Sequence, residues 1–246
     1  MEKVKRSKLV KKCLIATIVI CICFVGGFST WTSTAYEPTV SAMADMKSDS
    51  VITVEEDELI IFTPTEVIPT KGFIFYPGGL VEPQAYSTLC RDIANEGYLV
   101  VIAPMPLNLA VLSPDKADTI LERFNNIDTW AIGGHSLGGV MASSYAAKNS
   151  KIKGVALYAS YPQGDVLKNT DKKVVSIYGS NDGVADLNKI NNAELPKDAK
   201  LIEIKGGNHG QFGSYGEQKG DNKATISEDE QISETVKYTV ELLEGL

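Results

Sequence analysis

The sequence TWAIGGHSLGGVMASSY, residues 129–145, joins a short apolar run to a glycine-rich turn and then to a series of small residues. This order is typical of a buried strand that turns abruptly into a helix. Ser136 lies at the turn, in a Gly-x-Ser-x-Gly pattern completed by Gly134 and Gly138. Both glycines are needed because a side chain at either position would collide with the neighbouring strand or helix, and the strained turn lifts the serine hydroxyl clear of the sheet. We therefore predict that Ser136 is a nucleophile.

Backbone N–H groups near Ser136 are expected to stabilise negative charge. The helix that begins after the serine points its positive end at the hydroxyl, and the N–H of Leu137 is left free to bind a developing oxyanion. A second donor should come from the glycine-rich loop at residues 77–80, which follows an apolar strand. Gly79 is the first candidate for this N–H, and Leu80 is the alternative.

A serine hydroxyl needs a base that accepts its proton, and the chain has only two histidines. His135 belongs to the strained turn and would have to fold back on its neighbour, so we assign it a packed, supporting role. His209 lies in a glycine-rich loop just beyond the last predicted strand. Loops at the carboxyl ends of parallel strands are where ligands meet such sheets, so His209 is the candidate base. Neither histidine has ligand-spaced partners, and we expect no metal site and no cofactor.

A histidine base needs an acceptor that holds its tautomer and stabilises the imidazolium. The segment YGSNDG places Asp182 just after the strand that precedes the last one. The resulting chain order of serine, aspartate and histidine is that of the α/β-hydrolases. Asp186, four residues later, is the alternative if its loop curls. Ser136, Asp182 and His209 are thus the candidate catalytic residues.

Strand and helix patterns alternate from Gly72 to the C-terminus. Residues 98–103 form a nearly uniform apolar run, which marks a parallel sheet covered on both faces. Two β-rich runs at residues 51–54 and 59–62 flank four acidic residues and indicate an edge hairpin. The predicted fold is α/β: a doubly wound, mostly parallel sheet with helices on both faces. The other predicted strands lie at residues 72–76, 130–132, 154–159, 174–178 and 201–204, and helices begin near Pro83, Ser113, Ser136 and Ser227.

The first 35 residues are set apart by their composition. Six basic residues precede an uncharged run at residues 13–28, the layout of a secretory signal peptide or a short membrane anchor. Residues 33–35 resemble a cleavage site, whereas the run is also nearly long enough to span a bilayer, so both interpretations stay open. In either case the basic flank stays inside. The remainder should be exported, either secreted or anchored to the cell membrane facing outward, with a linker or a short helix at residues 36–50 and the folded domain at residues 51–246.

The exported part is acidic. The chain has 24 basic and 31 acidic residues, and the first 35 residues hold six of the former and one of the latter, which leaves a net charge of −12 on the rest. Such a charge disfavours nucleic acid as a partner. Cys90 is the one cysteine beyond the apolar run, so it cannot form an internal disulfide. Its place on an apolar helical face indicates a buried small hydrophobe rather than a nucleophile.

The short connection at residues 160–173 leaves no room for a separate cap domain, so we expect an open site. An apolar loop at residues 104–112 could form one wall of a groove beside Ser136, and packing of the same residues into the core is the alternative. An uncapped groove would favour short acyl esters. The candidate substrate-binding residues are Leu80, Met105, Leu107, Tyr161 and Phe212.

Five segments together resemble the α/β-hydrolase family, and most closely its small bacterial members related to dienelactone hydrolases. They are YPGGLVEPQAY, VVIAPMPLNLA, IGGHSLGG, YGSNDG and GGNHGQFGSYG, spread from about residue 51 to the C-terminus. The resemblance implies serine-dependent hydrolysis of an ester-like bond. Dienelactone hydrolases use a cysteine nucleophile where this chain has Ser136, so their substrate does not carry over.

The leading hypothesis is an exported serine hydrolase of the carboxylesterase type that acts on a small ester-like molecule through an acyl-enzyme intermediate. Acyl transfer or peptide cleavage by the same three residues is the second hypothesis. A third is a non-catalytic binding module that keeps the fold; a broken set of catalytic residues would favour it, and here the set is complete.

Overall fold

The computed structural model describes residues 17, 26–27 and 34–246. The chain divides into two compact units, Met1–Ala35 and Tyr36–Leu246. The predicted signal peptide or anchor falls in the first unit, and its apolar run lies almost wholly outside the described residues. Within the residues that are described, no helix has the length and apolar character needed to cross a membrane.

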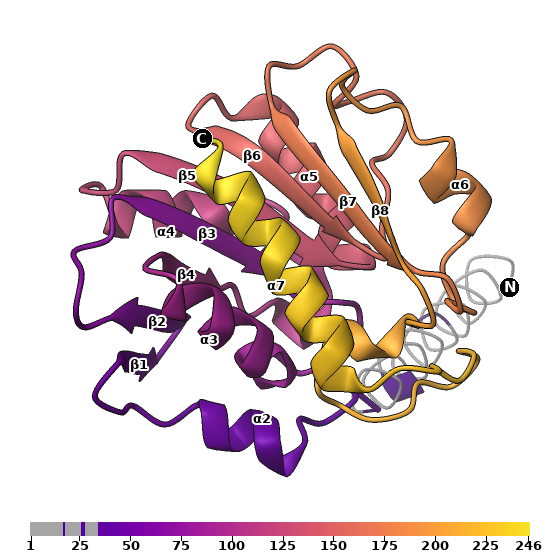
Figure 1. The fold of residues 1–246 in the computed structure, drawn as a ribbon, viewed down its shortest axis with the longest axis horizontal. Coiled ribbons are helices and arrows are strands. Elements are labelled where there is room, and N and C mark those ends of the chain that lie inside the picture. The colour runs from indigo at the N-terminus through magenta and orange to yellow at the C-terminus, as the bar shows by residue number, and fades with distance from the viewer. Residues whose placement is uncertain (1–16, 18–25, 28–33) are drawn as a thin grey trace, which may run out of the picture. The chain divides into compact units, whose positions relative to one another are not determined.

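The second unit contains an eight-stranded sheet with the strand order β1-β2-β4-β3-β5-β6-β7-β8 (Figure 1). β1 pairs with β2 and β2 pairs with β4 in antiparallel fashion, and every other pair is parallel. The sheet confirms the predicted fold class, with the hairpin at one edge. The strands are β1 (Ile52–Glu56), β2 (Ile60–Pro64), β3 (Lys71–Tyr76), β4 (Leu99–Ile102), β5 (Thr129–His135), β6 (Ile152–Tyr158), β7 (Lys173–Gly179) and β8 (Lys200–Ile204).

Helices cover both faces of this sheet, with α7 in front of the strands and α5 behind them in Figure 1. They are α2 (Val40–Asp45), α3 (Ser87–Asn95), α4 (Ala117–Arg123), α5 (Leu137–Lys148), α6 (Leu187–Asn191) and α7 (Glu228–Glu244), with 3₁₀ turns η1 (Pro83–Tyr86), η2 (Pro106–Asn108), η3 (Ala110–Leu112) and η4 (Gly210–Phe212).

The core accordingly has two layers, one on each face of the sheet. Successive residues of β3 point to opposite faces, so Phe73 and Phe75 join the layer under α3 and α7 whereas Ile74 joins the layer under α4 and α5. Cys90 of α3 is buried in the first layer, as expected, and burial raises the pKa of its thiol well above the ordinary value. The cysteine is therefore a core residue.

Residues 36–50 belong to the folded unit and contain the short helix α2, which was the alternative to a linker. Ala42 of α2 is fully buried, and its carbonyl accepts a hydrogen bond from Ser87 Oγ. Arg91 of α3 donates to the carbonyls of Asp45 and Lys47 at 2.8 Å each and forms an ion pair with Asp49. These contacts bind the segment to α3, so the domain begins at Tyr36. The sequence concealed this because the segment is polar on average and its partners lie about 45 residues away.

The connection between β6 and β7, residues 159–172, contains turns but no helix. No large cap is therefore inserted at this point, in agreement with the expectation from its length. At the carboxyl ends of β5, β6, β7 and β8, the covering structure is formed by the loops that follow these strands.

Candidate active site

Ser136 occupies a strained turn between β5 and α5. Its φ of 50° and ψ of −121° are unusual for a residue with a side chain. Its N–H donates to the Tyr158 carbonyl at 2.9 Å, and its own carbonyl accepts from Ser160 Oγ at 2.7 Å. A Cβ at Gly138 would lie 2.1 Å from the Tyr76 carbonyl oxygen, so only glycine fits there. The local structure is therefore the turn that the glycine spacing predicts.

Asp182 and His209 are brought together from the loops that follow β7 and β8. His209 Nδ1 lies 2.8 Å from Asp182 Oδ2, and both side chains are almost completely buried. The other carboxylate oxygen, Oδ1, accepts the N–H groups of Val184 at 2.8 Å and Ala185 at 2.7 Å. Because a carboxylate can only accept, Nδ1 is the donor in this bond, and Nε2 is the ring nitrogen left for a second partner.

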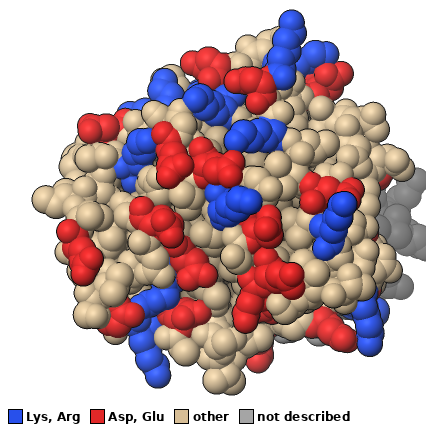
Figure 2. Space-filling model, in the orientation of Figure 1, with Lys and Arg blue, Asp and Glu red and all other residues tan. Residues whose placement is uncertain are grey.

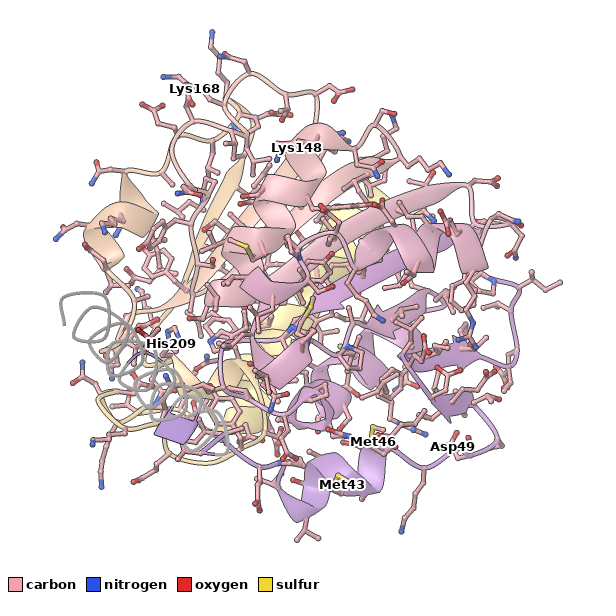
Figure 3. All side chains as sticks on the ribbon, turned by 180° about the vertical axis from the view of Figure 1, so that it is seen from behind. Met43, Met46, Asp49, Lys148, Lys168 and His209 are labelled. Atoms are coloured by element: carbon pink, nitrogen blue, oxygen red, sulfur yellow. The ribbon has the colours of Figure 1, made fainter. Side chains whose placement is uncertain are left out.

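His209 and Ser136 line one cavity of about 320 Å³. Figure 3 shows His209 among the loops at one end of the sheet, well separated from Lys148 at the far end of α5. The cavity is therefore at the carboxyl ends of the strands, where the sequence placed it. Its other lining residues are Leu137, Val140, Ala159, Ser160, Tyr161, Val184, Ala185 and Asp186.

Asp186, the alternative to Asp182, has a different set of partners. Its side chain caps the N-terminus of α6 and accepts the N–H groups of Asn188 at 3.1 Å and Lys189 at 3.3 Å. It lines the cavity, but the carboxylate bonded to His209 is that of Asp182. The geometry thus favours Asp182 as the partner of the histidine.

His135 is buried beneath the site and is held by Tyr86. The Tyr86 hydroxyl accepts the Gly78 N–H at 3.0 Å and lies 2.8 Å from His135 Nδ1. Burial raises the pKa of Tyr86, so the hydroxyl keeps its proton. Burial, followed by the neighbouring charge of His209, lowers the pKa of His135 well below its ordinary value. His135 is therefore a neutral ring whose centroid lies 4.5 Å from that of His209.

Tyr86 is not among the site residues predicted from the sequence. It links the glycine loop to His135 through the two hydrogen bonds just described and packs against Phe75 and Tyr215. No local pattern marks such a tyrosine, because its partners come from three other segments of the chain.

Two backbone N–H groups, those of Leu137 and Gly79, are the candidates for an oxyanion site. Leu137 is the first residue of α5, so its N–H has no acceptor one turn earlier in the helix. In the glycine loop, the Gly78 N–H is bonded to Tyr86 and the Leu80 N–H to the Asn108 carbonyl at 2.9 Å. Gly79 lies between them and beside Leu137, where an added Cβ would be 3.1 Å from Leu137 Cδ2. The structure thus favours Gly79 over Leu80.

Of the five predicted substrate-binding residues, only Tyr161 lines the cavity with Ser136. Phe212 is fully buried and stacks on Tyr158 with the ring planes 2° apart, and Met105 is 6% exposed in the core. Leu107 is 49% exposed on the surface. Met105 thus agrees with the alternative that the loop packs into the core, whereas Leu107 faces solvent and is not among the residues that line the cavity.

Leu80, the fifth predicted residue, is half-buried at the end of the glycine loop, with a φ of 57°. The cavity walls come instead from residues 159–161 and 184–186, at the ends of β6 and β7. Tyr161 also borders a wider, open groove of about 660 Å³ between residues 161–165 and 188–194. This groove therefore offers space for a substrate next to the cavity, on the side of Tyr161. Among the described residues, no group of three or more His, Cys, Asp or Glu side chains is placed to hold a metal ion.

Comparisons with known proteins agree with this architecture. The alpha/beta hydrolase family matches residues 72–233 of the chain. No curated protein matches it. Among solved structures, a predicted CIB-like hydrolase from Thermoplasma acidophilum has a TM-score of 0.60 at 16% identity, over 79% of this chain and 100% of that one.

Two further solved structures are similar. An esterase from Pyrobaculum calidifontis has a TM-score of 0.59 at 12% identity, over 83% of this chain and 88% of that one. The esterase domain of a Rhodothermus marinus protein has a TM-score of 0.59 at 12% identity, over 78% of this chain and 97% of that one. At such low identities, these similarities show the fold.

Proposed function

This chain belongs to the alpha/beta hydrolase family, and from that premise we propose that it is a serine hydrolase that cleaves an ester-like bond. One observation carries the proposal: His209 and Ser136 line the same cavity while His209 Nδ1 is hydrogen-bonded to the buried carboxylate of Asp182. The esterase and hydrolase descriptions of the similar structures support it. Within the family, we propose a relation to the small hydrolases that resemble dienelactone hydrolases.

The proposed reaction begins with attack by Ser136 Oγ on the carbonyl carbon of the substrate. His209 Nε2 accepts the hydroxyl proton as the new bond forms, and the carbonyl oxygen becomes an oxyanion. The N–H groups of Leu137 and Gly79 hydrogen-bond to this oxyanion, which stabilises it more than the neutral carbonyl. His209 then gives its proton to the leaving alcohol, and the acyl group stays on Ser136.

A water molecule then attacks the acyl-enzyme with His209 again as the base, and the carboxylic acid leaves. Asp182 takes part in both halves without giving up or receiving a proton. Its Oδ2 holds the ring in the tautomer that exposes Nε2, and its charge stabilises the imidazolium. The bonds from the Val184 and Ala185 N–H groups to Oδ1 keep the carboxylate oriented toward the ring.

Acyl transfer and peptide cleavage would use the same groups and would differ only in the acceptor or the leaving group. A non-catalytic module would bind without forming a covalent intermediate. A fluorophosphonate probe separates these classes, because it reacts with an activated serine whatever the natural substrate. We expect the folded domain to be labelled at Ser136, as determined by peptide mapping; an unlabelled wild-type protein would rule out the proposal.

A panel of acyl esters then determines which class of bond the protein cleaves and which acyl length it prefers. We expect hydrolysis of soluble short-chain p-nitrophenyl esters without a lag, because no large cap covers the cavity. A matched set of amides and of alcohol acceptors tests peptidase and transferase activity. A sharp rise in rate at a lipid interface, or a clear preference for long chains, would contradict an uncapped site.

We also propose that the domain acts outside the cytoplasm, either secreted or anchored by the N-terminal segment. The basic residues that precede the apolar run support this orientation. In Figure 2 basic and acidic side chains are intermingled on the face that is shown, which is consistent with a small-molecule substrate rather than nucleic acid as the partner. Protease added to intact cells should digest the domain, or the domain should be found in the medium.

A further inference from the structure

Asp221 lies on the connection between η4 and α7, and its carboxylate bridges the two loops of the site. Oδ1 accepts the Gly183 N–H and Oδ2 accepts the Gly210 N–H, each at 2.8 Å. Gly183 directly follows Asp182 in the chain, and Gly210 directly follows His209. One side chain therefore binds the residue after the acid and the residue after the base.

The neighbours of Asp221 continue this attachment. The Asn222 carbonyl accepts from Asn208 Nδ2 at 2.8 Å, and the Lys223 carbonyl accepts from Asn181 Nδ2 at 3.2 Å. Residues 221–223 thus form a strap that contacts the segments on both sides of the Asp182–His209 pair.

Gly183 shows how closely the strap approaches the acid loop. A Cβ added there would lie 2.7 Å from the Asn222 backbone nitrogen, which is closer than such atoms come in proteins. A side chain at this position would therefore push the strap away. The close approach is independent of the hydrogen bonds and indicates that the loop is built around the strap.

The strap completes a frame around the pair. On the N-terminal side of Asp182 and His209, a hydrogen bond from the Asn181 N–H to the Gly207 carbonyl at 2.8 Å joins the two loops directly. On the C-terminal side of both residues, the two loops are joined through Asp221. Hydrogen bonds to a carboxylate are about twice as strong as neutral ones, so this second joint resists separation of the loops.

We propose that Asp221 is a positioning residue that holds Asp182 and His209 at hydrogen-bonding distance; this rests on the proposed function of that pair. Asp221 acts through the backbone of its two glycine partners and does not touch the substrate. Loss of its carboxylate frees the N–H groups of Gly183 and Gly210, together with that of Asn222, and lets the loops separate. Displacement of a catalytic group by about 1 Å can cost about 100-fold in rate.

The test compares Asp221→Ala, which removes both acceptors, with Asp221→Asn, which keeps one. For p-nitrophenyl acetate, we expect kcat to fall about 100-fold in Asp221→Ala and about 10-fold in Asp221→Asn, with KM within twofold of the wild type. The rate of fluorophosphonate labelling should fall in parallel. Glu217→Gln is the matched control, because Glu217 is an exposed carboxylate of the same connection, and it should leave all three values unchanged.

A spectroscopic measurement separates positioning from a purely structural role. The proton between Asp182 and His209 should give a low-field ¹H NMR signal in the wild type that shifts or broadens in Asp221→Asn and is lost in Asp221→Ala. A lower Tm with unchanged kcat and an unchanged signal below the transition would overturn the proposal. If Asp221→Ala does not fold, the kcat and the signal of Asp221→Asn decide in the same way.

The experiment also separates failure of this proposal from failure of the proposed function. If wild-type protein is labelled at Ser136 but Asp221→Ala and Asp221→Asn are labelled at the wild-type rate, the positioning role is refuted and the hydrolase stands. If the wild type is not labelled at all, the proposed function itself is refuted.

Discussion

Two glycine-rich segments of this molecule each carry a histidine, and the histidines differ in nearly every other respect. In the turn at residues 133–139, backbone geometry is fixed by close contacts, and His135 points down to the Tyr86 hydroxyl. In the loop at residues 205–210, His209 is bonded to the Asp182 carboxylate and lines the cavity with Ser136. The surroundings of each ring therefore decide its chemistry: burial lowers the pKa of His135 well below its ordinary value, whereas the Asp182 carboxylate is hydrogen-bonded to Nδ1 of His209.

The largest effect should come from the turn itself. Ser136→Ala removes the proposed nucleophile but adds no bulk, so we expect a folded protein that is not labelled and whose ester turnover falls about 10⁴- to 10⁶-fold. Circular dichroism and Tm serve as the folding control. Activity within tenfold of the wild type would show that the turn does not supply the nucleophile.

The next test sets one histidine directly against the other. His209→Ala should lower turnover about as much as Ser136→Ala, because the proposed catalytic groups act as a unit. His135→Ala should instead lower the free energy of unfolding by about 1 to 3 kcal/mol, since it removes a buried hydrogen-bond partner of the Tyr86 hydroxyl. Activity is measured per folded molecule. Loss of activity in well-folded His135→Ala, with retention in His209→Ala, would reverse the assignment.

The third test concerns the partner that distinguishes His209. Asp182→Asn should lower kcat about 10⁴-fold, because an amide can hold the ring in the wrong tautomer. Asp186→Asn should have a small effect on kcat, since its carboxylate caps α6. Steady-state kinetics on the two matched variants gives the ranking. The opposite order would move the acid to Asp186.

The smallest effect concerns pH and His135. Since its pKa is lowered in the folded state, the unfolded chain gains a proton below the ordinary value of 6.5 that the folded chain does not. Stability should therefore fall as the pH decreases below 6.5, by at most about 1.4 kcal/mol per pH unit from this residue. Urea unfolding at pH 7.5 and 5.5 measures the change in the free energy of unfolding. His135→Gln is the reference, because it lacks the contribution of this histidine. Equal pH dependence in both proteins would show that His135 is protonated when folded.

The fold was predictable because its signals are local. Apolar runs of strand length, helical faces between them and the glycine spacing around Ser136 are all read within a few residues, and the structure confirms the doubly wound sheet. The burial of each side chain in the loop at residues 104–112 could not be predicted, because apolar residues in a loop have the same sequence pattern whether they line a cavity, enter the core or face solvent. Met105 and Leu107 differ in exposure although they are only two positions apart.

By itself, the sequence determined the class of fold, the strained turn at Ser136 and a short set of candidate acids, bases and oxyanion donors, because each depends on residues that are neighbours in the chain. Only the tertiary structure decided between the members of each pair: Asp182 over Asp186 as the partner of His209, and Gly79 over Leu80 as the free N–H. It alone revealed Tyr86 beneath the site and Asp221 across its loops. The physical reason is that a hydrogen bond selects its partner by distance and direction in space, and the bonds from Tyr86 to His135 and from His209 to Asp182 join residues 49 and 27 positions apart in the chain.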